Sequence, residues 1–179
     1  LCSFFIHLDP TSCSEGSFYS RQWGMLPELL NANGFRTNWI QHFLFSPAVP
    51  NVQRGLEWLR LFNNDSSKQG HHTFLDSYLT LSVVIKVLKN WFRLYAASWR
   101  LRSIHTAFHP KKSAVCLWPV LRKDWYTYTY GIGALINLLW FELFNTAFKE
   151  MPYQETGLYL CENQGWERAF LYAWKKFGH

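Results

Sequence analysis

The stretch Gly157-Leu158-Tyr159-Leu160-Cys161-Glu162-Asn163-Gln164-Gly165 joins a short apolar run directly to a helical pattern that continues to Phe177. An apolar run of four or five residues, closed by polar residues and glycine, is typical of a buried strand. The helix after it ends with Lys175 and Lys176 in its last turn, where basic side chains are favoured. This strand-to-helix connection indicates an α/β fold.

The rest of the chain repeats this alternation. Further strands are predicted at 3–8, 35–45 and 114–118, and helices at 20–33, 51–62, 73–108 and 131–148, with a polar loop at 63–72. Strands separated by helices favour a parallel sheet covered on both faces. We therefore expect a three-layer, Rossmann-like parallel sheet flanked by helices, forming one domain over residues 1–179.

Composition supports a folded chain with an anionic partner. Of the 179 residues, 49% are hydrophobic and 17% charged, and the 10 Trp, 9 Tyr and 15 Phe exceed what one small core requires. The net charge is +6, and nine basic residues between Lys86 and Lys123 have no acid among them. Nucleic acid, phospholipid or a phosphorylated small molecule would complement this charge.

The ends of the chain, its cysteines and its apolar stretches indicate what kind of protein it comes from and where that protein is located. The sequence begins at Leu1 within an apolar run and stops at His179 after a helical stretch, so we expect a fragment of a longer protein. The four cysteines form no CxxC pair, which favours a reduced, cytoplasmic chain. No stretch reaches the ~18 uninterrupted apolar residues of a spanning helix.

Ligands of open α/β sheets bind outside the carboxyl ends of the strands, which makes Glu162, Asn163 and Gln164 the sharpest candidates. Glu162 could orient a hydroxyl or act as a base, and the amides of Asn163 and Gln164 could bind polar groups at the helix start. The alternative is that Glu162 or Asn163 only caps the helix.

Asp9, after the first strand, could accept a proton or bind a sugar hydroxyl, although Asp-Pro is also a common turn. Arg21 could bind a phosphate or lie solvated. His105 and His109 share a helix face, but no third ligand lies near them in sequence and both also suit a last helical turn, so no metal site is predicted.

The predicted helix 73–108 carries two different faces. Apolar residues recur at three- and four-residue steps, and we expect this face to pack: Leu81, Val84, Leu88, Trp91, Tyr95 and Trp99. Lys86, Lys89, Arg93 and Arg100 fall in one opposite sector. Signatures of nucleic-acid modules are absent, so we expect no nucleic acid. The sector fits an anionic membrane, or else is an ordinary solvated face.

Four segments resemble bacterial surface carbohydrate (O-antigen type) biosynthesis proteins: 157–169, 7–10, 19–23 and 70–78. The resemblance covers most of the chain. It implies a glycosyltransferase of the two-domain GT-B architecture, of which this chain would be the N-terminal, acceptor-side half. The alternative is a non-catalytic membrane-peripheral or carbohydrate-binding module of a polysaccharide assembly complex.

The resemblance also implies roles for individual residues. Glu162 and Asp9 would be catalytic, while Arg21, Asn163, Gln164, Asp124, Trp125 and Trp166 would line the acceptor site, the two tryptophans by stacking on sugars. The implied partners are a carbohydrate or lipid-linked acceptor and the missing C-terminal domain of the same chain. No cofactor is expected here, and a nucleotide-sugar donor is expected for the longer protein, working in the cytoplasm at the periphery of the inner membrane.

Overall fold

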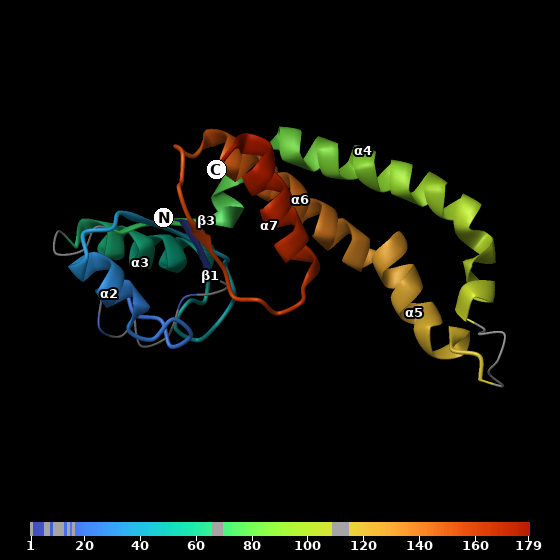
Figure 1. Cartoon of the computed structure of the whole chain (residues 1–179), viewed down its shortest axis with the longest axis horizontal. Helices are drawn as coiled ribbons and strands as arrows, with labels where there is room; N and C mark the ends of the chain where they lie inside the picture. Colours follow the sequence, from blue (N-terminus) through green and yellow to red (C-terminus); the bar gives the residue numbers. More distant parts are fainter. Residues whose placement is uncertain are drawn as a thin grey trace. The chain divides into compact units, whose positions relative to one another are not determined.

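The computed structural model describes residues 2–5, 8, 13, 15, 17–65, 70–108 and 115–179 (Figure 1). The chain divides into two compact units. The first, the sheet unit, comprises Leu1–Tyr78, Ala147–Gln164 and Trp174–His179, and the second, the helical unit, comprises Leu79–Thr146 and Gly165–Ala173. The prediction of a single domain stays a prediction.

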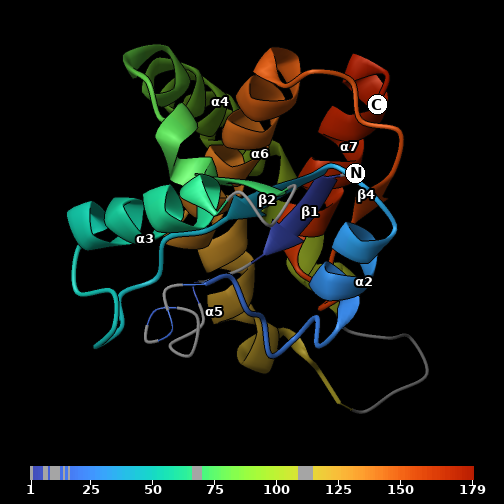
Figure 2. The same cartoon turned by 90° about the vertical axis from the view of Figure 1, so that its left-hand side faces the viewer.

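The sheet unit is built on four parallel strands in the order β3-β2-β1-β4 (Figure 2). The strands are short: β1 (Cys2–Phe5), β2 (Thr37–Gln41), β3 (Gly70–Phe74) and β4 (Gly157–Leu158). Ser3 pairs with Trp39 on one side and with Leu158 on the other. Two segments far apart in sequence therefore lie side by side, and the carboxyl ends of all four strands meet at one edge.

Helices α2 (Leu26–Ala32) and α3 (Val52–Asn64) belong to the same unit. The side chain of Asn51 caps α3 by accepting a hydrogen bond from the Arg54 amide at 2.8 Å. Gly55 of α3 faces Phe74, and a Cβ added to this glycine would lie 2.9 Å from the ring. The missing side chain thus lets α3 pack closely over β3. The core that results contains Leu8, Cys13, Phe18, Trp39, Val49, Leu59, Phe62 and Phe74.

Asn63 ties the end of α3 to β3. Its side-chain oxygen accepts from the His72 amide at 2.7 Å, and its side-chain nitrogen donates to the His72 carbonyl at 3.0 Å. These bonds satisfy the backbone amide and carbonyl of His72 in β3, which is the strand at one end of the described sheet. After β3, the short 3₁₀ helix η1 (Leu75–Tyr78) ends this part of the sheet unit.

The helical unit contains most of four α-helices and one 3₁₀ segment: α4 (Leu81–Ser98), η2 (Trp99–Phe108), α5 (Trp118–Thr129), α6 (Ile132–Glu150) and α7 (Gly165–Phe177). Thr80 caps α4 through a bond from the Val83 amide. Asn90 of α4 donates to Glu142 of α6 at 3.0 Å, and the Trp91 indole donates to the Tyr130 carbonyl at 2.7 Å. Buried polar groups therefore hold α4 in register within this unit.

The predicted fold class was wrong. The chain is dominated by helices and its small sheet is not a three-layer Rossmann-like sheet. Strands do pair in parallel, but the strand expected at 114–118 is not formed by its described residues, since Val115–Leu117 are irregular and α5 begins at Trp118. Pro119 suits the first turn of a helix, which an apolar run of five residues cannot reveal by periodicity alone. Ala114 lies outside the described residues.

The predicted helix 73–108 also needs correction. Its start, Thr73–Phe74, belongs to β3, and the helix itself begins only at Leu81. The residues expected to pack are mostly exposed: Leu81, Val84, Leu88, Tyr95 and Trp99. Val83 and Val87 are buried in their place. The face that packs differs from the predicted one, because apolar residues occupy two faces of the helix and periodicity does not distinguish them. The helices predicted near 131–148 and 166–177 are confirmed.

No single helix among the described residues has both the length and the apolar character needed to cross a membrane. One bent pair, α5 with α6, meets these criteria only when the two helices are taken together, with a 40° bend between them.

Replacing Asn63 tests the link between α3 and β3. We expect Asn63→Ala to lower the free energy of unfolding by about 1–2 kcal/mol, because two hydrogen bonds to the His72 backbone are lost. The neighbouring Asn64→Ala is the matched control and should change it by less than about 0.5 kcal/mol. Urea unfolding of both variants measures the difference, and equal midpoints would contradict this role of Asn63.

Candidate functional site

The carboxyl edge of the sheet carries titratable side chains after three of its four strands. His42 follows β2 directly, Asp76 lies two residues after β3, and Glu162 lies four residues after β4. In the strand order β1 lies between β2 and β4, and Asp9, predicted to follow the first strand, falls outside the described residues. All belong to the sheet unit. This edge is the candidate functional site.

His42 and Asp76 form an imidazole–carboxylate pair at the ends of β2 and β3. His42 Nδ1 lies 3.1 Å from Asp76 Oδ2, and the same oxygen accepts the Phe43 backbone amide at 3.0 Å. The side chains are 29% and 39% exposed, so solvent or a ligand can reach both. Two neighbouring strands thus position the pair, because His42 and Asp76 each follow the point where their strand leaves the sheet.

The surroundings of Asp76 favour its charged form. Burial of this carboxyl acts to raise its pKa, but the hydrogen bonds from His42 and the Phe43 amide, with the charge of His42, hold the pKa of Asp76 below its ordinary value of 3.8. A carboxylate that stays charged fixes the orientation of the imidazole and stabilises its protonated form. The arrangement suits a histidine that accepts a proton during a reaction.

Beside the pair, Gln41 ends β2 in a fully buried position. Its side-chain nitrogen lies 3.1 Å from Nδ1 of His72, which is itself buried among the rings of Phe18 and Phe62. Among the described residues, the side-chain oxygen of Gln41 has no hydrogen-bond partner. A buried polar pair, Gln41 with His72, therefore lies at the end of β2, directly before His42 in sequence.

The segment after β4 places its three predicted residues in one exposed loop. Glu162, Asn163 and Gln164 are all exposed, and they follow a strand that ends at Leu158 rather than at Cys161. Asn163 adopts the left-handed backbone region with φ of 57°, which asparagine tolerates better than most residues. The loop turns the chain into α7. Whether Glu162 acts on a ligand or caps α7 stays open.

The other predicted acceptor residues belong to different units. Arg21 is exposed in the turn before α2, in the sheet unit, whereas Asp124, Trp125 and Trp166 belong to the helical unit. Trp166 is buried and its ring lies 6.4 Å from that of Trp140, so core packing accounts for it. Asp124 is exposed on α5. Their acceptor-binding roles stay predictions.

Trp125 has a more specific setting. It lines a cavity of about 350 Å³ in the helical unit, together with Tyr95, Trp99, Trp118, Tyr126 and Tyr130. Its ring also contacts that of Phe108 at 6.1 Å. Aromatic walls suit an apolar or sugar-like ligand, and the binding role of Trp125 stays a prediction.

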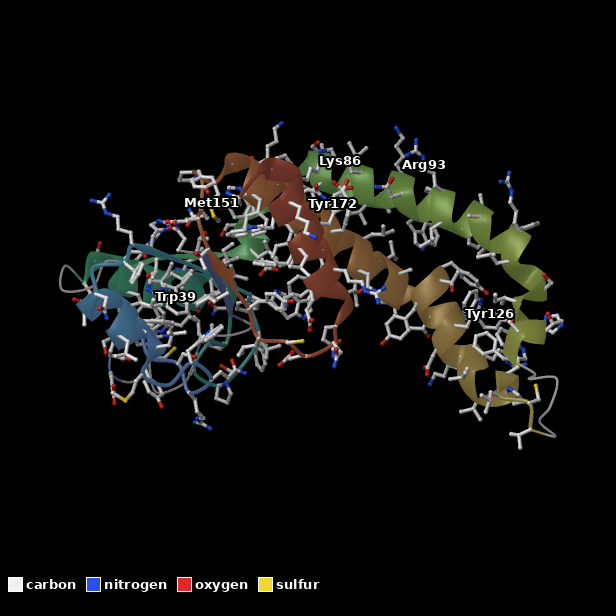
Figure 3. The ribbon with its side chains drawn as sticks, in the orientation of Figure 1. Trp39, Lys86, Arg93, Tyr126, Met151 and Tyr172 are labelled. Atoms are coloured by element: carbon white, nitrogen blue, oxygen red, sulfur yellow. The ribbon has the colours of Figure 1, made fainter. Side chains whose placement is uncertain are left out.

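The four basic residues predicted to form an exposed sector are all exposed, although Arg100 lies in η2 and the packed face is not the one predicted. Lys86, Lys89, Arg93 and Arg100 are all exposed, and Lys86 and Arg93 lie along the outer edge of α4 (Figure 3). Their role toward a membrane stays a prediction. In the part of the chain that the structure describes, no three His, Cys, Asp or Glu residues are grouped as a metal site would require. His109 lies outside that part.

His42 and Asp76 could not be predicted as site residues from the sequence, for a physical reason. The apolar run 35–45 hid the end of β2 at Gln41, and the predicted helix from Thr73 hid the end of β3 at Phe74. The signal available was the polar pair Gln41-His42 inside that run.

Comparison of the chain with protein-family models, with curated proteins and with solved structures finds no match. The surface-carbohydrate resemblance therefore stays a prediction.

The environment of Asp76 predicts how stability changes with pH. Because its native-state pKa is lowered, the unfolded chain binds this proton at a higher pH than the native state does. The stabilisation is present above the ordinary pKa and is lost as the pH falls through the native-state value. Between about pH 5 and 3, wild type should lose more unfolding free energy than Asp76→Asn.

Urea unfolding at several pH values measures this difference. The loss of unfolding free energy in the His42→Asn variant should lie between those of wild type and Asp76→Asn, since the Phe43 amide still binds Asp76. If the unfolding free energies of wild type and Asp76→Asn change with pH in parallel, the partners of Asp76 do not lower its native-state pKa and the prediction is contradicted.

Proposed function

We propose that this chain supplies the acceptor-binding side of a glycosyl transfer reaction, with the carboxyl edge of its sheet holding the acceptor hydroxyl. The observation that carries the proposal is the His42–Asp76 pair, fixed at the ends of two adjacent parallel strands and open to solvent. The choice of carbohydrate as substrate rests on the resemblance to surface carbohydrate biosynthesis proteins.

The proposed chemistry follows from the geometry of the pair. Nδ1 of His42 is engaged with Asp76, so Nε2 is the ring nitrogen that would receive the proton of an acceptor hydroxyl. The hydroxyl oxygen forms a bond to the anomeric carbon of a nucleotide sugar, and the bond from that carbon to the phosphate oxygen breaks. The nucleoside diphosphate leaves with the electron pair, and Asp76 stabilises the imidazolium formed.

Glu162 would serve the same substrate from the other side of β1. A carboxylate that accepts hydrogen bonds from sugar hydroxyls positions the ring without taking the proton itself. Asn163 and Gln164, in the same exposed loop, can add amide contacts. This assigns proton transfer to His42 and orientation of the acceptor to Glu162.

Removing the imidazole tests the proton-transfer role. We expect His42→Asn in the intact protein to lower kcat by about 10²-fold or more with a small change in KM, because asparagine can still bind Asp76 but lacks a base. The assay is release of nucleoside diphosphate from a panel of nucleotide sugars. His71→Asn, which replaces an exposed histidine of β3, is the control and should retain wild-type turnover. Wild-type kcat in His42→Asn would refute the role.

Glu162→Gln separates orientation from proton transfer. The amide keeps the shape and loses the charge, so we expect KM for the acceptor to rise about tenfold with kcat nearly unchanged. Glu155→Gln, another exposed glutamate of the sheet unit, is the matched control. A loss of kcat of about 10²-fold in Glu162→Gln, with His42→Asn fully active, would make Glu162 the base.

The alternative is a non-catalytic membrane-peripheral or carbohydrate-binding module. The exposed basic sector of α4 favours the membrane-peripheral form of this alternative. The same turnover assay separates the two functions, since a binding module releases no nucleotide from any sugar donor.

A further inference from the structure

The structure shows a second apolar face on α4 that faces away from the packed one. Leu81, Ile85, Leu88 and Phe92 are between 45% and 75% exposed, and we call them the apolar stripe. Steps of four, three and four residues separate them, which keeps all four on one side of the helix. The packed side is different: Val83 and Val87 are buried there, and Trp91 bonds to Tyr130.

The basic residues border this stripe on one side only. Lys86, Lys89 and Arg93 each come directly after a member of the stripe: Ile85, Leu88 and Phe92. Arg100 extends the basic series just past the end of α4, at the start of η2. One step along a helix rotates the side chain by roughly 100°, so each basic group projects from the same flank of the stripe. The helix therefore presents an apolar strip with a continuous cationic edge.

We propose that α4 docks on an anionic lipid surface, with the apolar stripe inserted among the lipids and the four basic side chains bound to phosphate headgroups. A helix of this kind lies in the plane of the interface, with its apolar side buried at the boundary between headgroups and acyl chains. Phe92, which is 62% exposed, adds an aromatic ring to the inserted side.

Charge argues for lipid over a second copy of the chain. A four-three apolar repeat also suits helix pairing, but antiparallel pairing would bring the cationic edges of two identical helices together, and parallel pairing would place each edge beside a flank without acidic residues. The sequence of α4 contains no Asp or Glu that could compensate them. An anionic lipid surface removes this repulsion and attracts each basic residue. The inference holds whether or not the chain takes part in glycosyl transfer.

Vesicle co-sedimentation tests the charged edge. We expect the chain to bind vesicles that contain a quarter phosphatidylglycerol and to bind pure phosphatidylcholine far more weakly. Replacing Lys86, Lys89, Arg93 and Arg100 by Gln should reduce the partition coefficient by about 10²-fold or more, at roughly fivefold for each charge. The control removes the same charge elsewhere, at Arg36, Arg60, Lys149 and Lys175 of the sheet unit, and should have a much smaller effect.

A second pair of variants tests the stripe. Phe92→Ser should weaken binding about tenfold, because an inserted ring is lost. Leu61→Ser, an exposed leucine on α3, should leave binding unchanged. Both positions are exposed, so folding is retained. Equal binding to neutral and anionic vesicles, or full binding after loss of the four charges, would overturn the proposal. So would a dimer in sedimentation velocity that Phe92→Ser dissociates, since the stripe would then pair two chains.

Discussion

Parallel pairing of β1 with two partners is the constraint on which the sheet unit depends. Ser3 pairs with Trp39 and with Leu158, so the first described strand lies between the second and the last. Parallel neighbours need crossover connections, and the connection from β3 to β4 contains most of the helical unit. Because all four strands run the same way, the residues that follow them converge on one edge. His42, Asp76 and Glu162 share that edge for this reason.

We propose two kinds of function within one chain, one at the candidate site and one along α4. At the sheet edge, a carboxylate whose pKa is lowered by its partners holds an imidazole in a fixed orientation, an arrangement that serves proton transfer. Along α4, exposed apolar and basic side chains alternate in sectors, an arrangement that serves attachment to a surface. If the acceptor is lipid-linked, attachment through α4 would concentrate the chain where its substrate lies.

Sequence patterns predicted the long elements better than the short ones. The apolar segment near 131–148 and the helix that follows Gly165 were recognised because each carries several turns of consistent pattern. β3 was missed because Gly70, His71, His72 and Thr73 are not apolar, although His72 and Phe74 point to the core. The packed face of α4 was misassigned because two faces are apolar and periodicity cannot rank them. His42 and Asp76 were hidden by the misplaced ends of β2 and β3.

Hydrogen-exchange mass spectrometry tests the central claim most directly, that the carboxyl edge of the sheet is where a carbohydrate acceptor binds. The intact protein would be compared with and without an oligosaccharide selected from a bacterial glycan array. The account predicts slower exchange in peptides that cover residues 42–44, 75–78 and 159–164, with little change in α3 on the same unit. Protection confined to α3 or to the helical unit, with the three edge peptides unchanged, would contradict it.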